Sequence, residues 1–405
     1  MNDNDVDILI VGGGLVGASL AIALDDCGWR VALAEAAAPR VDAQPSYDER
    51  NLALARASLN ALDALGVLAQ AAVQPTPIGR IHISRRGDFG HVQLDASALG
   101  LPAFGGVLSA RELGNALLAR LDQCRSLRRI APAQLVAIAE HADAVEVRLN
   151  TPVGEQRLRS RLLVGADGTE SFVRNHFGIG VQRHAYGQSA LVTTLTTEYA
   201  MRDQAWERFT DSGPLALLPL GGHRAGLVLC VASEDAERVA ALDDVDFIDL
   251  VQQRFGYRAG RLSRPGRRKP YPLNRMLADV LIAPRTVLVG NAAQTVHPLG
   301  AQGFNLGLRD ALSLAECVRA ARAEHSDPGA AALLHAYVDR RRADRAATTS
   351  FSDDLVHLMG NELLPVSAAR SLGFLTLAGM PFLQRKVALR GMGFRGDAST
   401  LALSR

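Results

Sequence analysis

The chain has few cysteines and almost no excess charge, and each shortage excludes a class of protein. Only four cysteines occur among the 405 residues, and their positions (27, 124, 230 and 317) give neither C-x-x-C nor zinc-ligand spacing. We therefore expect reduced structural thiols, as in a cytosolic protein, and no metal site. The net charge of +2 gives no general reason to expect nucleic acid as a partner.

Long uncharged apolar stretches are also missing. No run of 18 such residues occurs, so no membrane-spanning helix is predicted. Asp3 and Asp5 flank the start of the first apolar strand, where a secretory signal would carry basic residues. The expected location is the cytoplasm, with peripheral contact to the inner face of the cytoplasmic membrane left open. The length favours two closely packed domains over one simple core.

A glycine-rich turn follows the first predicted strand. Gly12, Gly14 and Gly17 have the G-x-G-x-x-G spacing of a dinucleotide-binding turn. The first glycine permits the tight turn, the second lets the backbone approach a pyrophosphate, and the third lets helix and strand pack closely. A second predicted strand, residues 30–34, ends at Glu35, whose carboxylate can accept hydrogen bonds from ribose hydroxyls. This pattern predicts a dinucleotide site but does not separate FAD from NAD.

A second glycine-rich segment, residues 290–307, lies far along the chain. It follows a predicted buried strand over 286–289 and leads into an amphipathic helix that continues through Leu314. A strand end, a glycine turn and a helix start together point backbone N–H groups at an anion. One long dinucleotide is therefore expected to touch both glycine turns, and a flavin is the first candidate.

Three smaller features each allow two interpretations, one structural and one functional. Asp167 and Gly168 end a predicted strand, where an Asp-Gly pair is either an ordinary turn or a cofactor contact. Arg50 is either a surface residue or a guanidinium placed near a pyrophosphate or flavin. His297 precedes a proline, and a histidine in that position is more often a hydrogen-bonded structural residue than an acid or base.

The order of the predicted helices and strands indicates an α/β fold with an inserted sheet and a helical C-terminal part. Helices and strands alternate to about residue 180, and Ser109 with Glu112 predicts a capping box at the start of one helix. Strand-like runs over 188–231 indicate an inserted antiparallel sheet, and the chain is mostly helical from 328 onward. The charged run 339–345 is interpreted as a solvated, salt-bridged helix face.

The two glycine segments and Asp167-Gly168 resemble the motifs of the class A FAD-dependent aromatic hydroxylases, the relatives of para-hydroxybenzoate hydroxylase, in order and approximate spacing. The resemblance covers essentially the full length. Within the class, the chain is most similar to the ubiquinone-biosynthesis hydroxylases, of the 2-polyprenyl-6-methoxyphenol hydroxylase type. Residues 206–210 (Trp-Glu-Arg-Phe-Thr), 213–216 and 354–358 support this placement. Asn291 stands where the class usually has aspartate, which keeps an acceptor oxygen but loses the charge.

The resemblance implies a Rossmann-like FAD-binding domain with an inserted antiparallel-sheet substrate domain and a helical C-terminus. The expected limits are 1–180 with 270–330 for the FAD-binding domain, 181–269 for the substrate domain, with about 76–105 as a further candidate part, and 331–405 for the helical region.

The resemblance also implies the reaction. NAD(P)H or another reductant reduces the flavin, O₂ adds at its C4a carbon, and the resulting hydroperoxide transfers one oxygen atom to the ring of a polyprenylated phenol, 2-polyprenyl-6-methoxyphenol, in ubiquinone biosynthesis. Other ubiquinone-biosynthesis proteins are potential partners. The alternatives are a sibling hydroxylase acting at another ring carbon and a non-enzymatic prenyl-lipid-binding protein on the same scaffold.

Site residues follow from the resemblance position by position. The first turn supplies Gly12, Gly14, Leu15, Val16 and Gly17, and Glu35 is expected at the adenosine ribose. Arg50 and Arg111 are expected along the FAD, and Asp167, Gly168 and Asn291 at its centre. Pro298, Gly300, Gln302, Gly303, Phe304 and Asn305 are expected beside the flavin ring. His297 is the candidate catalytic residue, as a lining residue of the ring cavity.

A polyprenylated phenol is membrane-soluble, so we looked for a segment that could contact a membrane. Residues 371–383 are largely apolar and are followed by Arg385, Lys386, Arg390 and Arg395, a combination that suits an anionic membrane surface. The competing interpretation is a C-terminal helix packed over the core or against a partner subunit.

Overall fold

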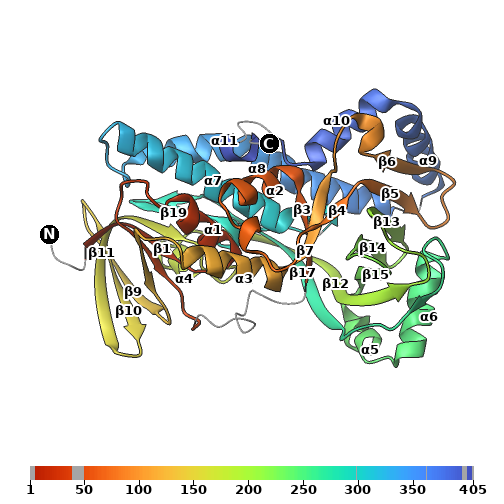
Figure 1. Ribbon diagram of the computed structural model, residues 1–405, viewed down its shortest axis with the longest axis horizontal. Coiled ribbons are helices and arrows are strands. Elements are labelled where there is room, and N and C mark those ends of the chain that lie inside the picture. The colour runs from red at the N-terminus through yellow and green to blue at the C-terminus, as the bar shows by residue number, and fades with distance from the viewer. Residues whose placement is uncertain (1–4, 39–49, 298, 362, 395–398, 404–405) are drawn as a thin grey trace.

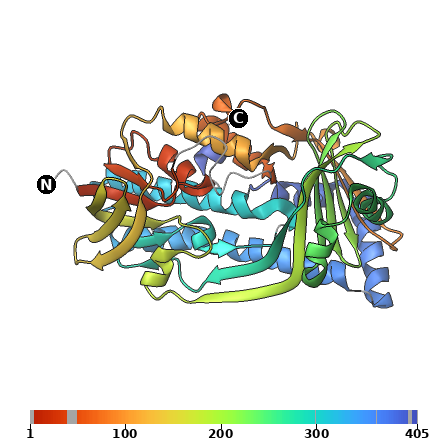
Figure 2. The ribbon, with the colours of Figure 1, turned by 90° about the horizontal axis from the view of Figure 1, so that it is seen from below.

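The computed structural model describes residues 5–38, 50–297, 299–361, 363–394 and 399–403. Two large sheets lie at opposite ends of an elongated molecule, and long helices run along one side (Figure 1). Figure 2 shows two long strands, β12 (Val181–Thr197) and β17 (Lys269–Ala278), running between the two ends. The two ends are therefore joined by sheet hydrogen bonds as well as by helices.

The first sheet contains the N-terminal strand and has eight strands. Its main path is β18-β19-β11-β1-β2-β8, with bounds Ile282–Ala283, Thr286–Leu288, Gly154–Gly165, Asp5–Val11, Val31–Ala34 and Leu127–Ile130. The central strands are parallel, and β10 (Val145–Thr151) and β9 (Gln134–Glu140) extend the sheet in antiparallel fashion. Ile8, Leu9 and Ile10 are fully buried, as expected for a parallel strand covered on both faces.

Helices α1 (Leu15–Ala23), α3 (Ala110–Leu121) and α7 (Gln302–Ala323) pack with this sheet in one hydrophobic core. The predicted cap of α3 is confirmed, because the Ser109 hydroxyl accepts a hydrogen bond from the Glu112 N–H at 3.1 Å. Two short helices, α2 (Arg56–Ala64) and α4 (Phe172–His176), complete this end of the molecule.

The second sheet has nine strands. Its main path is β20-β17-β12-β15-β14-β13-β5-β6, with bounds Gln294–Thr295, Lys269–Ala278, Val181–Thr197, Arg224–Ala232, Gly213–Pro219, Gln204–Thr210, Arg80–Arg85 and His91–Asp95, and β16 (Leu262–Ser263) pairs with β12. Helices α5 (Ala236–Ala240) and α6 (Asp244–Phe255) pack on its outer face. A small sheet of β3 (Asn51–Ala55), β7 (Gly105–Ser109) and β4 (Thr76–Ile78) lies against the opposite face. The domain limits given above remain a proposal.

The C-terminal part is helical: α8 (Ala331–Gly360), α9 (Leu364–Gly379), α10 (Pro381–Gly391) and α11 (Thr400–Leu403). Helix α9 packs on β6, and its Arg370 guanidinium binds Asp88, in the turn between β5 and β6, at 2.6 Å. Both side chains of this pair are about 1% exposed. Breaking a buried pair of this kind is costly, so the pair fastens α9 to the β5–β6 hairpin.

The interpretation of residues 339–345 as a solvated face is wrong in part. Arg341 and Asp344 are buried between α8 and α7, and only Arg342 and Asp339 form an exposed pair. Arg341 binds Asp310 of α7 and Asp344, each at 2.8 Å. Asp344 also binds Arg309 of α7 at 2.7 Å. The sequence shows the charges of this run but not that α7 supplies charged partners for one side of α8.

Replacing Arg341 by methionine tests this network, because it removes the buried cation that binds Asp310 and one of the two that bind Asp344. We expect the free energy of unfolding to fall by about 3–5 kcal/mol. Replacing Arg342, in the exposed pair, should change it by about 1 kcal/mol or less. Chemical denaturation of both variants measures the difference, and equal effects would contradict the assignment of the network to the core.

Candidate functional site

The first glycine turn leaves no room for side chains. A Cβ on Gly12, whose φ is +103°, would lie 2.4 Å from the Ala166 carbonyl oxygen, and one on Gly17 would lie 1.9 Å from the Gly12 carbonyl oxygen. Helix α1 starts directly after the turn, and its N-cap, Gly14, provides no side-chain cap. The first N–H groups of α1 are therefore available to an anion such as a pyrophosphate.

Glu35 stands at the end of β2 and fixes this turn. One oxygen of its carboxylate accepts a hydrogen bond from the Gly13 N–H, and the other accepts one from the Ala37 N–H at 2.8 Å. The side chain remains partly exposed at a small hollow that Leu118 and Arg129 also line. The carboxylate thus holds the turn while part of it stays accessible.

The second glycine segment meets the first at one side chain. A Cβ on Gly290 would lie 3.1 Å from the Val16 methyl groups, and one on Gly307 would lie 2.7 Å from a Val16 methyl. The strand-turn-helix order was predicted, but the helix begins only at Gln302, after two short 3-10 turns and strand β20. Two glycine segments that are distant in the sequence therefore pack together on Val16.

Buried polar groups hold the second segment from behind. The Asp310 carboxylate accepts hydrogen bonds from the Gly290 N–H at 3.2 Å and from the Gln294 side-chain amide at 2.5 Å. Arg345 donates to the Gln294 side-chain oxygen at 2.9 Å and to the Ala278 carbonyl at 2.7 Å. Sequence reasoning missed Asp310 and Arg345, because neither belongs to a glycine motif.

Several predicted site residues have local structural partners. Asp167 accepts hydrogen bonds from the Ser171 hydroxyl at 2.5 Å and the Val173 N–H at 3.1 Å, so it helps to start α4. The Asn305 side chain pairs with β3, accepting from the Ala55 N–H at 2.9 Å and donating to the Ala53 carbonyl at 3.0 Å. These bonds give both residues a role in the fold; a contact with a cofactor remains a proposal.

The other predicted residues border the same region. Asn291, Gly300 and Gly303 are exposed, Gly14, Leu15, Val16, Gly168, Arg111 and Phe304 are partly exposed, and Gln302 is buried with its amide donating to the Gly300 carbonyl at 2.9 Å. The Arg50 guanidinium is exposed, 5.4 Å from the centre of the Tyr271 ring. Pro298 lies outside the described residues.

His297 is fully buried. Its Nδ1 accepts a hydrogen bond from the Leu299 N–H at 3.1 Å, which leaves the ring proton of the neutral form on Nε2. Nε2 has no hydrogen-bond partner among the described residues. Burial lowers the pKa of His297 to about 4, so the ring is neutral at pH 7. The Tyr186 ring contacts it edge-on at 4.8 Å, and the Tyr186 hydroxyl donates to Asp353 of α8.

The face of the second sheet opposite α5 and α6 carries a row of side chains in register: Val192, Val228, Ala216, Glu207 and Ile83. All five are partly exposed, whereas the outward-facing leucines of the same strands, such as Leu215 and Leu227, are fully buried. We call these five residues the inner strip. Val228 and Tyr186 pack against the same buried cluster of Ala190, Cys230 and Leu273, and Tyr186 contacts His297, so the inner strip lies near the second glycine segment.

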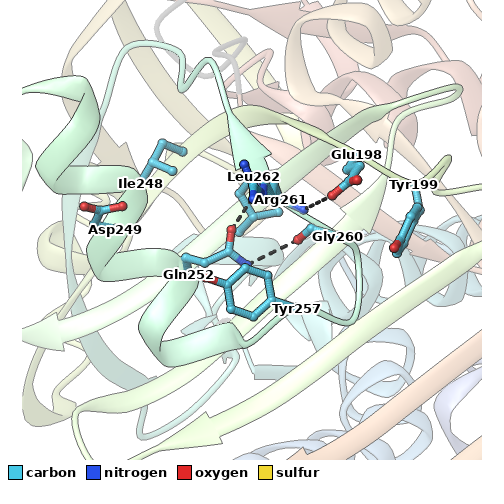
Figure 3. Close-up of a pocket in the computed structure, with 9 residues that line it drawn as sticks. All are labelled: Glu198, Tyr199, Ile248, Asp249, Gln252, Tyr257, Gly260, Arg261 and Leu262. Atoms are coloured by element: carbon cyan, nitrogen blue, oxygen red, sulfur yellow. Dashed lines mark hydrogen bonds between the residues drawn. The ribbon is translucent and has the colours of Figure 1, made fainter.

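A hollow of about 510 Å³ lies away from both glycine turns, against α6 and β16 (Figure 3). The Gln252 side chain projects into it, donating to the Gly256 carbonyl at 2.7 Å and accepting from the Leu262 N–H at 2.8 Å. The Glu198 carboxylate accepts from the Arg261 N–H at 2.8 Å. These polar groups hold the α6–β16 loop together, and the hollow shares no residue with the glycine turns.

Comparison with known proteins agrees with this geometry. The sequence profile of the FAD binding domain family matches residues 5–352. Among solved structures, p-nitrophenol 4-monooxygenase PnpA from Pseudomonas putida DLL-E4 superposes with a TM-score of 0.80 at 19% identity, over 97% of this chain and 99% of that one. P. aeruginosa PqsL in complex with 2-aminobenzoylacetate gives a TM-score of 0.76 at 25% identity, over 92% of this chain and 100% of that one. The fold and the matched profile thus define a protein with an FAD binding domain.

Two characterised relatives narrow the class. Ubiquinone hydroxylase UbiL of Rhodospirillum rubrum is 37% identical over 96% of this chain and 90% of its own length. The 3-demethoxyubiquinol 3-hydroxylase of Escherichia coli strain K12 is 33% identical over 97% of this chain and 100% of its own length. The chain belongs to this family of FAD-dependent ubiquinone hydroxylases, and it is an aromatic-ring monooxygenase that uses FAD.

The depressed pKa of His297 predicts a loss of stability in acid. The pKa is about 4 in the folded protein, below the usual 6.5, so protonation favours the unfolded state. The stabilisation is therefore complete above about pH 6.5 and is lost as the pH falls towards 4, by about 3 kcal/mol. In His297→Gln this part of the pH dependence should disappear. Denaturation curves between pH 7 and pH 4 compare the two proteins, and parallel pH profiles would contradict the prediction.

Proposed function

We propose that the protein hydroxylates the aromatic ring of a polyprenylated phenol, 2-polyprenyl-6-methoxyphenol, in ubiquinone biosynthesis. The observation that carries the proposal is the meeting of the two glycine segments at Val16, beside an inner strip that is apolar apart from Glu207. An apolar strip suits a prenylated ring, since burial of apolar surface stabilises such a complex. The names of the two ubiquinone hydroxylases above support the same substrate class.

The residues present fit an extended FAD. The uncapped start of α1 would hold the pyrophosphate, since anions are stabilised at a helix N-terminus. Glu35 would hold the adenosine ribose, Arg50 and Arg111 would lie along the cofactor, and Asp167 with Asn291 would hold its centre. Gly300, Gln302, Gly303 and Phe304, at the start of α7, would lie beside the ring.

FAD, when bound, supplies the electron transfer from NAD(P)H and the activation of O₂. The protein would provide the environment of the bound flavin. Backbone N–H groups at the start of α7 would stabilise negative charge on a flavin ring bound beside them. With a substrate bound on it, the apolar part of the inner strip would keep water away from the ring, which would protect the oxygen transfer from side reactions. The neutral His297 ring offers an Nε2–H donor, and not a basic nitrogen, to a bound molecule.

A second candidate is hydroxylation at a different ring carbon. The Escherichia coli relative, which this chain matches over its full length, is a 3-demethoxyubiquinol 3-hydroxylase. The two candidates share the flavin site and differ only in how the ring is turned on the inner strip. The position of the added oxygen in the product distinguishes them.

Purified protein tests the function. Bound oxidised flavin should absorb near ~370 and ~450 nm, and NAD(P)H oxidation should be coupled to incorporation of one ¹⁸O atom from ¹⁸O₂ into a short-chain prenylated 2-methoxyphenol.

Gly17→Ala should lose most of the flavin, because its Cβ would lie 1.9 Å from the Gly12 carbonyl oxygen. Gly373→Ala, in α9 with nothing within 4 Å of the added Cβ, is the matched control. A colourless wild-type protein, or NAD(P)H oxidation without ring oxygenation, would overturn the proposal.

We propose that the C-terminal helices contact the membrane from which such a substrate comes. Helices α9 and α10 and the residue between them expose apolar side chains: Leu372, Leu375, Met380, Phe382 and Val387. Arg385, Lys386 and Arg390 are exposed on α10 beside these apolar side chains, a combination typical of an interfacial helix on an anionic surface. Arg395, the fourth residue of the predicted basic flank, lies outside the described residues. No single described helix is long and apolar enough to cross a membrane; only the bent pair Pro365–Gly379 and Pro381–Gly391, at 99°, passes by length and composition.

Phe382→Asp tests this contact. Wild-type protein should float with vesicles of equal parts phosphatidylcholine and phosphatidylglycerol, and less with phosphatidylcholine alone. Phe382→Asp should reduce flotation with the mixed vesicles severalfold, because the side chain is 75% exposed and its apolar contact with lipid is lost. Tyr257→Asp, an equally exposed aromatic residue near the outer face of the second sheet, should float like wild type. Equal flotation of all three proteins would show that α10 does not bind lipid.

A further inference from the structure

The inner strip carries one ionisable side chain, Glu207 on β13. Its neighbours in register are Ala216 on β14 and Ile83 on β5, and Val228 and Val192 continue the row. Neighbouring strands are about 4.8 Å apart, so the carboxyl is flanked on both sides by apolar groups at contact distance. A carboxyl in such a row loses its hydration without gaining a partner from the sheet.

Glu207 has no ion-pair or hydrogen-bond partner for its carboxyl among the described residues. Burial raises the pKa of this carboxyl to about 8, so most of it is neutral at pH 7. The residue nevertheless remains partly exposed, so a space large enough for solvent reaches it. A carboxyl that has lost part of its hydration and has no protein partner is stabilised by a hydrogen bond that a ligand supplies.

Two further polar atoms without partners border the same face. Asn51 Nδ2 is buried and has no hydrogen-bond partner among the described residues. It lies 2.5 Å from where a Cβ on Gly226 would be, and Gly226 precedes Val228 by two residues on β15, on the same face of the sheet. His297 Nε2, near Val228 through Tyr186, is the second such atom. Apolar walls with a few unpaired polar groups are typical of a small-molecule site.

We propose that Glu207 binds the ring hydroxyl of the phenol, with the prenyl tail lying on the apolar part of the inner strip. This rests on the proposed function and assigns a substrate contact to a residue outside the flavin motifs. The hydroxyl donates its hydrogen bond to a Glu207 carboxyl oxygen.

When Glu207 is ionised, the phenol O–H bond breaks and the proton bonds to the carboxylate. The electron pair stays on the substrate oxygen and is shared with the ring, which makes the ring a better nucleophile towards an electrophilic oxygen. Other charged or titratable groups lie on this side of the sheet or pack against it: Arg50, Arg85, Tyr186, Cys230, Lys269, Tyr271, Arg275, His297 and Asp353. Arg275 and Asp353 are paired with each other, Arg85 is bound to the Met359 carbonyl and Asp211, and the Lys269 ammonium lies 5.3 Å from the centre of the Tyr271 ring. Among the described residues, none of these cations is paired with Glu207.

Equilibrium binding to the FAD-loaded enzyme tests the assignment. The probes are 2-methoxy-6-prenylphenol and its O-methyl ether, which lacks the hydroxyl donor, and binding is followed by the change in flavin absorbance. Wild type should prefer the phenol by about tenfold, the value of one hydrogen bond to a carboxyl. Glu207→Leu should bind both probes equally, and Glu207→Gln, which keeps an acceptor oxygen, should retain part of the preference. Asp249→Asn, an exposed carboxyl on α6, is the control and should behave like wild type.

The pH profile of turnover is the second readout. Wild-type turnover should rise from pH 7 to pH 9 as Glu207 ionises, and Glu207→Gln should lack this rise. If wild type binds and hydroxylates the phenol while Glu207→Leu keeps the full preference, this assignment is overturned and the proposed function stands. If wild type binds neither probe, both are overturned. Flavin content of each variant shows that it folds.

Discussion

The site depends on one buried carboxylate. Asp310 binds Arg341 on one side and, on the other, the Gly290 N–H and the Gln294 amide. The second glycine segment is thereby held against Val16, the residue on which the two glycine segments pack together. In a dry interior such bonds are strong only when every partner is present. Helices α7 and α8 therefore determine the cofactor site although neither supplies a glycine of the first turn.

The two faces of the second sheet have different roles, because its side chains alternate between them: one face packs on helices and the other is available for binding. Leucines pointing outward pack under α5 and α6 in a buried core, whereas the five residues of the inner strip, which point inward, remain partly exposed. Because successive strand residues face opposite sides, changing the inner side chains alters what the sheet can bind without disturbing the outer core. The strands β12 and β17 reach towards the flavin-binding end, so the inner strip has a fixed position relative to it.

Local rules in the sequence predicted most of the fold but only part of the site. The glycine spacing, the strand before it and the Ser109 cap were predictable because each depends on a few neighbouring residues. The burial of Arg341 and Asp344 was not, because the charged run of α8 looks the same whether water or α7 faces it. Glu207 belonged to a segment quoted for its family likeness, and only the strand register shows that it faces inward among apolar neighbours. Asp167 and Asn305 were predicted for a cofactor, and the structure adds backbone partners for both.

The Arg370–Asp88 pair links two regions that were described separately. Asp88 closes the hairpin of β5 and β6, and β5 carries Ile83, the last residue of the inner strip. Helix α9 bears part of the exposed apolar surface. The ion pair thus joins it to the same hairpin whose strand β5 places Ile83 beside Glu207. Any change in the position of α9 would therefore either break this buried ion pair, which is costly, or shift the hairpin that carries Ile83.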